Sequence, residues 1–99
     1  MANTFDRGSA IIIEATLMKT EPFESSTLWD PTSVKISVYD AAGNAKVSDA
    51  DMSRKDTGKY YYILQTEEDW ESGYYAVEIK ASDASYSDRF YDDVAFELV

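Results

Sequence analysis

Cysteine and histidine are both absent from the 99 residues of this chain, and each absence excludes a kind of chemistry. Without cysteine there is no disulfide and no thiolate-bound zinc, the usual supports of a very small domain. Without histidine the chain lacks the side chain that most often acts as a general base near pH 7 or as a metal ligand. Any metal site must therefore use oxygen ligands, which suit calcium or magnesium.

Positive charge and long apolar runs are also scarce. Nine lysines and arginines stand against nineteen aspartates and glutamates, so the net charge is −10. Phosphate backbones and anionic membranes repel such a surface, and we therefore expect binding neither to nucleic acid nor to membranes. No stretch approaches the roughly 20 apolar residues of a membrane span. Residues 1–7 do not read as a signal peptide, and the apolar run at residues 11–13 is too short for one.

What the sequence does contain is apolar alternation with a period of two. Val34, Ile36 and Val38 alternate with polar residues, the pattern of a strand with one buried and one wet face. Similar alternation recurs between residues 11 and 18, 59 and 65, 74 and 81, and 86 and 99. The last stretch is interrupted near residues 92–93, which indicates a β-bulge. At this length we expect a single domain over residues 1–99.

Six to seven short strands separated by turns predict an all-β fold, an antiparallel β-sandwich, with a jelly roll or small barrel as the alternative. Residues 20–32 are expected as a loop that crosses between sheets, and the polar segment 48–56 as a loop anchored by Met52. Lys35 and Glu78 are expected on outward, wet faces. The residues expected to face inward are Val34, Ile36, Val38, Tyr60, Tyr62, Leu64, Tyr75, Val77, Ile79, Val94, Phe96 and Leu98.

Two segments share an acid-x-Gly-x-Tyr arrangement ahead of an alternating strand. One runs from Asp56 to Tyr60 and the other from Glu71 to Tyr75. Each resembles the tyrosine corner of immunoglobulin-type sandwiches, in which a tyrosine hydroxyl bonds to backbone at a turn between sheets. Only one of them can be the corner, and the sequence leaves the choice between Tyr60 and Tyr75 open.

The chain as a whole resembles immunoglobulin-like or fibronectin-like modules of prokaryotic surface proteins and of tailed-virus structural proteins. The resemblance rests on residues 30–40, Gly43, residues 58–62, residues 73–79 and Phe96. The cysteine pair and intervening tryptophan of antibody domains are missing, so antibody-like recognition is not implied. Such modules serve many functions, so the resemblance implies a fold more than an activity.

This resemblance and the missing catalytic set lead us to expect a non-catalytic structural or interaction module. The leading hypothesis is a head, neck, tail or decoration protein of a tailed virus, found in the virion or in the cytoplasm of the host cell. The start at Met1 without a leader fits this expectation. The alternative is one module of a secreted surface protein that serves adhesion or polysaccharide binding. A third hypothesis is an enzyme inhibitor with an exposed loop at residues 23–29.

Carboxylates in the predicted loops are weighed as catalytic or calcium-binding groups. Asp49 and Asp51 stand at alternate positions, but the spacing of an EF-hand is missing. Among nineteen acids, close pairs such as Asp92 and Asp93 arise by chance. We therefore assign no catalytic residue, metal ligand or cofactor, and leave calcium binding by the acidic loops open.

Apolar residues on predicted wet faces are the candidate interface. Tyr39, Tyr61 and Tyr74 fall on such faces, with Ile12 and Ile63 in phase beside them. Outward aromatic and aliphatic groups indicate a contact surface when they cluster, although ordinary cross-strand pairing explains them equally well. We expect a protein partner at such a surface, basic or neutral because the chain is acidic, with self-association as an open alternative.

Overall fold

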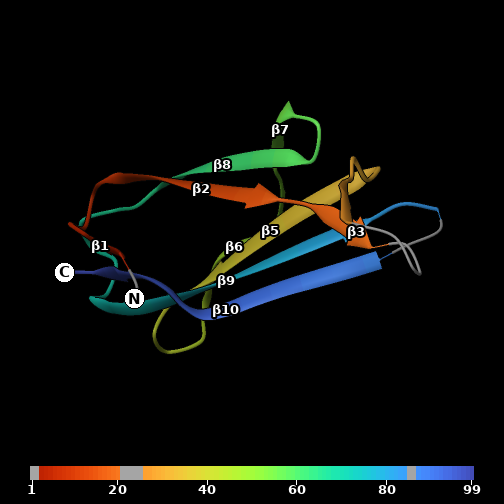
Figure 1. Cartoon of the computed structure of the whole chain (residues 1–99). Helices are drawn as coiled ribbons and strands as arrows, with labels where there is room; N and C mark the ends of the chain where they lie inside the picture. The colour runs from red at the N-terminus through yellow and green to blue at the C-terminus, as the bar shows by residue number, and fades with distance from the viewer. Residues whose placement is uncertain (1–2, 21–25, 85–86) are drawn as a thin grey trace.

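The strands form two main sheets that lie one over the other (Figure 1). The computed structural model describes residues 3–20, 26–84 and 87–99. Its strands are β1 (Asn3–Phe5), β2 (Ala10–Thr16), β3 (Met18–Thr20), β4 (Ser26–Leu28), β5 (Ser33–Tyr39), β6 (Ala45–Asp51), β7 (Ser53–Asp56), β8 (Lys59–Gln65), β9 (Gly73–Ser82) and β10 (Ser87–Leu98). The larger sheet has the order β1-β10-β9-β5-β6 and the smaller one β2-β8-β7, while β3 pairs with β4. The chain is thus all-β with two facing sheets, which is compatible with the predicted sandwich.

The strands of the described residues outnumber the six to seven that were expected. Three of them, β1, β3 and β4, have three residues each, too few to show a period of two. The segment expected as a polar loop instead forms most of β6 and all of β7. The β1–β10 pair is parallel, whereas the prediction had antiparallel strands throughout. The part of the chain that the structure describes holds no helix long and apolar enough to cross a membrane.

The core lies between the sheets and draws residues from both. Every residue expected to face inward is buried except Tyr62, which is partly buried, and Val94, of which 43% is exposed. The expectation was wrong for Val94 because the β9–β10 register shifts between Asp92 and Phe96, so the predicted bulge also breaks the alternation. The residues expected to face inward did not include several further core residues, which are Ile11, Leu17, Trp29 and Ala81.

Met52 marks the point where the chain passes from one sheet to the other. It follows β6 of the larger sheet and precedes β7 of the smaller one, and only 8% of it is exposed. Its N–H donates to the carbonyl of Val34 in β5 at 3.0 Å. The expected apolar anchor is therefore real, but it joins two strands instead of tethering a loop.

A buried aspartate organises the turn between β5 and β6. The Asp40 Oδ1 atom accepts the N–H groups of Ala42 at 3.0 Å and Asn44 at 2.8 Å. Gly43 has a φ of +88°, which the turn requires and which glycine adopts without strain. The Asn44 N–H is the main cause that lowers the pKa of Asp40, and the Ala42 N–H and the charge of Lys46 lower it further.

The two candidate corner tyrosines make different hydrogen bonds. The Tyr75 hydroxyl donates to the backbone carbonyl of Glu71 at 2.7 Å, and its ring stacks on Trp70 and Phe96. The Tyr60 hydroxyl donates to a side chain instead, Oδ1 of Asp30 at 3.3 Å. Burial is the main cause that raises the pKa of both phenols. Tyr75 therefore makes the side-chain-to-backbone bond that a tyrosine corner needs.

Asp30 joins the β7–β8 turn to the start of β5. Its Oδ1 accepts the Gly58 N–H at 2.8 Å, and its Oδ2 accepts Arg54 Nε at 3.2 Å. The Gly58 bond, followed by the Arg54 bond, lowers the pKa of Asp30. Gly58 has a φ of +69°, and a Cβ there would lie 2.8 Å from the Leu17 carbonyl oxygen. Only glycine fits this close approach of three segments.

Candidate protein-interaction surfaces

The five residues expected at an interface lie on two different sheets. Tyr39 and Tyr74 are on the outer face of the five-stranded sheet, in β5 and β9. Ile12, Tyr61 and Ile63 are on the outer face of the three-stranded sheet, in β2 and β8. The sequence pattern gave the outward direction of each side chain, but the sheet to which a strand belongs depends on long-range pairing. The structure therefore gives two smaller surfaces in place of one.

The surface on the three-stranded sheet is a pair of isoleucines. Ile12 and Ile63 are direct cross-strand partners, with 63% and 57% of each residue exposed. Tyr61 lies opposite Glu14 and is partly buried. Two aliphatic side chains that pack across neighbouring strands stabilise the sheet by themselves. This patch therefore has an adequate explanation in the fold.

The surface on the five-stranded sheet is a shallow groove of about 710 Å³. Three tyrosines from three strands line it: Tyr39 of β5, Tyr74 of β9 and Tyr91 of β10. Tyr39 lies opposite Ala76 in the sheet, and Tyr91 lies opposite Glu78. Because Ala76 has a short side chain, the rings stand around a depression. We name this surface the tyrosine groove.

Tyr91 and its neighbour Arg89 were not selected from the sequence. The guanidinium of Arg89 lies 5.2 Å from the centre of the Tyr91 ring, which is cation–π geometry. Both side chains leave β10 on the outer face, where they line the groove. Arg89 and Tyr91 stand at alternate positions of the sequence, as residues on one face of a strand do. The prediction for this strand named only its inward residues.

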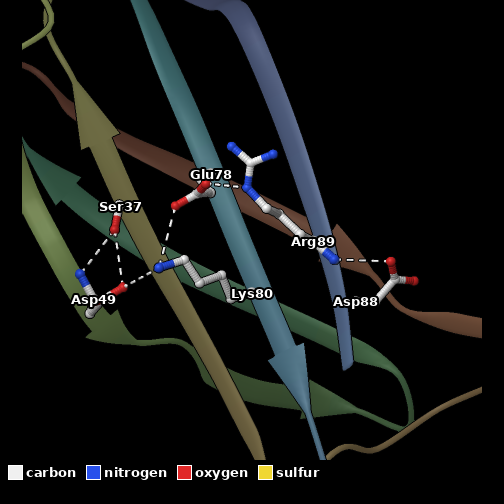
Figure 2. Close-up of polar contacts among 6 residues, drawn as sticks. All are labelled: Ser37, Asp49, Glu78, Lys80, Asp88 and Arg89. Carbon is white, nitrogen blue, oxygen red and sulfur yellow. Dashed lines mark hydrogen bonds and ion pairs between the residues drawn. The ribbon is translucent and has the colours of Figure 1, made fainter. Parts of the chain in front are cut away.

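A row of cations lies beside the tyrosine groove. Lys35, Lys80 and Arg89 are successive cross-strand partners in β5, β9 and β10. Like charges in this arrangement repel and destabilise a sheet unless anions lie between them. Figure 2 shows that Lys80 Nζ lies between Asp49 Oδ1, at 3.3 Å, and Glu78 Oε1, at 3.6 Å. The hydrogen bond to Asp49 and the charges of both carboxylates raise the pKa of Lys80.

Glu78 was expected on a wet face, and the structure shows it only 7% exposed. It does point away from the core, but its neighbours cover it. Lys80 pairs with its Oε1 and Arg89 Nε donates to its Oε2 (Figure 2). Ser37, its partner in β5, is buried as well. A carboxylate tolerates this burial because two cations pair with it. The period of two predicted correctly the face on which Glu78 lies, but it did not predict that neighbouring side chains bury it.

Asp49 and Asp51, weighed as calcium ligands, each bind a lysine. Asp51 pairs with Lys35, while Asp49 Oδ1 accepts Lys80. The Asp49 N–H also donates to Ser37 Oγ at 3.0 Å, and this bond accompanies a φ of +49° at Asp49. Within the described ranges, no group of three or more acidic side chains is placed to hold a metal ion.

The hypothesis of an inhibitory loop concerns residues 23–29, of which residues 23–25 lie outside the described part. Trp29, at the end of this segment, belongs to the core, and its Nε1 donates to Asp83 Oδ2 at 2.8 Å. This tryptophan therefore has a role in the fold.

The tyrosine groove thus combines phenol rings with neighbouring ion pairs on one sheet face. This arrangement is suited to binding the surface of another molecule. No family model, curated protein or solved structure matches this chain. Function is therefore inferred from the geometry of the groove and from the edges of the sheets.

Proposed function

We propose that this protein is a non-catalytic interaction module that docks onto a protein partner through the tyrosine groove. The observation that carries the proposal is the convergence of Tyr39, Tyr74 and Tyr91 around one depression. Tyrosine suits an interface because its ring buries apolar area while its hydroxyl still finds a hydrogen-bond partner. Each Å² of apolar area buried there would contribute about 25 cal/mol before the costs of association.

The fold that we propose for this module is an immunoglobulin-like sandwich. The order β10-β9-β5-β6 facing β2-β8-β7 follows the two sheets of a variable-type domain. The bond from Tyr75 to the Glu71 carbonyl supports the same interpretation, because the tyrosine corner lies at the start of the corresponding strand. The parallel β1 adds to the edge of the larger sheet beside β10.

The assembly that we propose is the particle of a tailed virus, in which the module would be a head, neck, tail or decoration component. The resemblance of the sequence supports this assignment. A repeating particle offers many copies of one docking site, each of which can bind one module. The net charge of −10 favours a basic or neutral partner and makes association sensitive to salt. Copies of the module repel one another for the same reason.

The experiment is reconstitution of the tagged protein onto purified particles that lack it, followed by co-sedimentation. The double variant Tyr39→Ser/Tyr74→Ser should lose binding, since both rings line the groove. Tyr61→Ser is the matched control, because it removes an outward tyrosine from the other sheet and should leave binding intact. Circular dichroism checks that each variant is folded. Equal binding by the wild type and the double variant would contradict docking through the tyrosine groove.

The alternative function is adhesion through a polysaccharide, as a module of a surface protein. Aromatic rings beside a shallow groove can stack on the apolar faces of sugar rings, and the exposed Arg89 and Asp93 of its lining supply polar groups. Binding to a glycan array, lost in Tyr39→Ser/Tyr74→Ser and without any binding to particles, would favour this alternative over particle assembly.

A further inference from the structure

A seam lies open between the free edges of β2 and β10. In the described part of the chain β2 pairs only with β8, and residues 87–92 of β10 pair only with β9, because β1 joins β10 from Phe96 onward. The seam is a groove of about 370 Å³ that both edge strands line. Its lining includes the core residues Ile11, Val77 and Ile79. The seam thus reaches the edge of the hydrophobic core, although these three residues are themselves buried.

The β10 edge leaves an inward side chain uncovered. Phe90 lies opposite Ile79 and therefore shares the inward face of the sheet, yet 41% of it is exposed. Every residue of β10 from 87 to 94 is exposed. A phenylalanine that faces inward at an unpaired sheet edge offers apolar area that an added strand can cover.

Two carboxylates flank Phe90 on the same face. Asp88 and Asp92 lie two residues before and after it, and in the described residues neither carboxylate forms an ion pair with a lysine or arginine. Oδ1 of each accepts a nearby backbone N–H, from Arg89 at 2.9 Å and from Val94 at 3.0 Å. Inward charges on an edge strand repel uncharged strands. A strand that carries its own cations at matching positions would not be repelled.

We propose that the seam accepts an extended segment of a partner protein, which adds a strand beside residues 87–92 of β10 and has the pattern basic-x-apolar-x-basic. Side chains alternate along a strand with a period of two, so three alternate residues of the partner face Asp88, Phe90 and Asp92. The apolar residue covers Phe90, and the two cations pair with the aspartates. Backbone bonds to the free edge supply affinity, and the side chains supply selectivity.

A second copy of this chain does not fit the pattern. Lys55 and Lys59 are its one pair of cations four residues apart, with Thr57 between them instead of an apolar residue. That segment also bends through the β7–β8 turn. The net charge of −10 opposes self-pairing further. The occupant is therefore a basic segment of another protein, and this site goes beyond docking through the tyrosine groove.

The test uses nuclear magnetic resonance of the isotope-labelled full chain, titrated with the peptide acetyl-TTKTITKTT-amide. The amides of residues 87–92 should shift and exchange more slowly with solvent, and binding should weaken as salt rises. Two control peptides, acetyl-TTETITETT-amide and the rearranged acetyl-TTKKTITTT-amide, should bind much more weakly. Equal binding of the acidic peptide, or a response that leaves residues 87–92 unchanged, overturns the proposal.

Matched variants test the two charge pairs. Asp88→Asn/Asp92→Asn should weaken binding of the peptide roughly threefold to tenfold, as expected for two exposed ion pairs. The amide side chains can still accept the two backbone N–H groups, so the fold should persist. Glu68→Gln/Asp69→Asn makes the same change in net charge outside the seam and should leave the affinity unchanged. Undiminished affinity in the first variant contradicts the proposed basic-x-apolar-x-basic pattern.

The variant Tyr39→Ser/Tyr74→Ser should still bind the peptide, because its substitutions lie outside the seam. The peptide test is therefore independent of docking through the tyrosine groove.

Discussion

The hydroxyl of Tyr75 donates to the carbonyl of Glu71, four residues earlier, while the ring of Tyr75 is fully buried. Tyr75→Phe should therefore lower the free energy of unfolding by about 0.5–1.5 kcal/mol, because the fold loses one hydrogen bond. Tyr60→Phe should cost less, since Asp30 keeps its bonds to Gly58 and Arg54. Urea unfolding of both variants compares them. A larger loss in Tyr60→Phe would reverse the assignment of the corner.

Val77 lies in β9 at the centre of the larger sheet and is buried. Val77→Ala should lower the free energy of unfolding by roughly 1–3 kcal/mol, because it leaves a cavity between the sheets. Val94→Ala removes the same two methyl groups from an exposed position and should change stability by less than about 0.5 kcal/mol. Chemical denaturation of the pair tests the core directly. Equal losses would contradict the exposed position of Val94.

Gly58 and Gly43 both have positive φ, but their surroundings differ. A Cβ at Gly58 would lie 2.8 Å from the Leu17 carbonyl oxygen, whereas a Cβ at Gly43 meets nothing within 4 Å. Gly43→Ala should cost about 1–2 kcal/mol through backbone strain alone. Gly58→Ala carries the same strain and adds the clash, so its melting temperature should fall further. Similar losses in the two variants would show that the approach to Leu17 relaxes easily.

Acid should destabilise the fold through Asp30 and Asp40. Hydrogen bonds lower the pKa of both carboxyls below the ordinary 3.8. The unfolded chain therefore binds protons at a higher pH than the folded chain. The stability that these groups contribute is complete above about pH 4 and is lost as the pH falls through their folded pKa values. Asp40→Asn should flatten the decline of the urea midpoint in acid. Asp93→Asn, with the same charge change outside the turn, is the control.

Alternation predicted most of the core because it depends only on local geometry. Val34, Ile36 and Val38 repeat with the pleat of β5, and no distant contact is needed to tell which face they share. Val94 was misplaced because it lies inside the bulge between Asp92 and Phe96, and the sequence signals a bulge without giving its width. Glu78 was misplaced because its burial depends on cations from neighbouring strands.

The candidate site was harder to predict than the core because it depends on strand order. Tyr39, Tyr74 and Tyr91 meet only because β9 lies between β5 and β10 in the sheet, and β5 is far from the other two strands in the sequence. Tyr61 has the same outward pattern but belongs to the opposite sheet. The open seam depends on which edges remain unpaired, which alternation does not indicate.

The parallel pairing of β1 with β10 determines how the protein would respond to tension. Asn3 lies opposite Phe96 and Phe5 opposite Leu98, so the two strands run in the same direction at one end of the molecule (Figure 1). A force that pulls backward on the start of β1 and forward on the end of β10 slides one strand along the other. The hydrogen bonds between them then bear the load together instead of breaking one after another. This end of the fold has the geometry of a mechanical clamp loaded in shear.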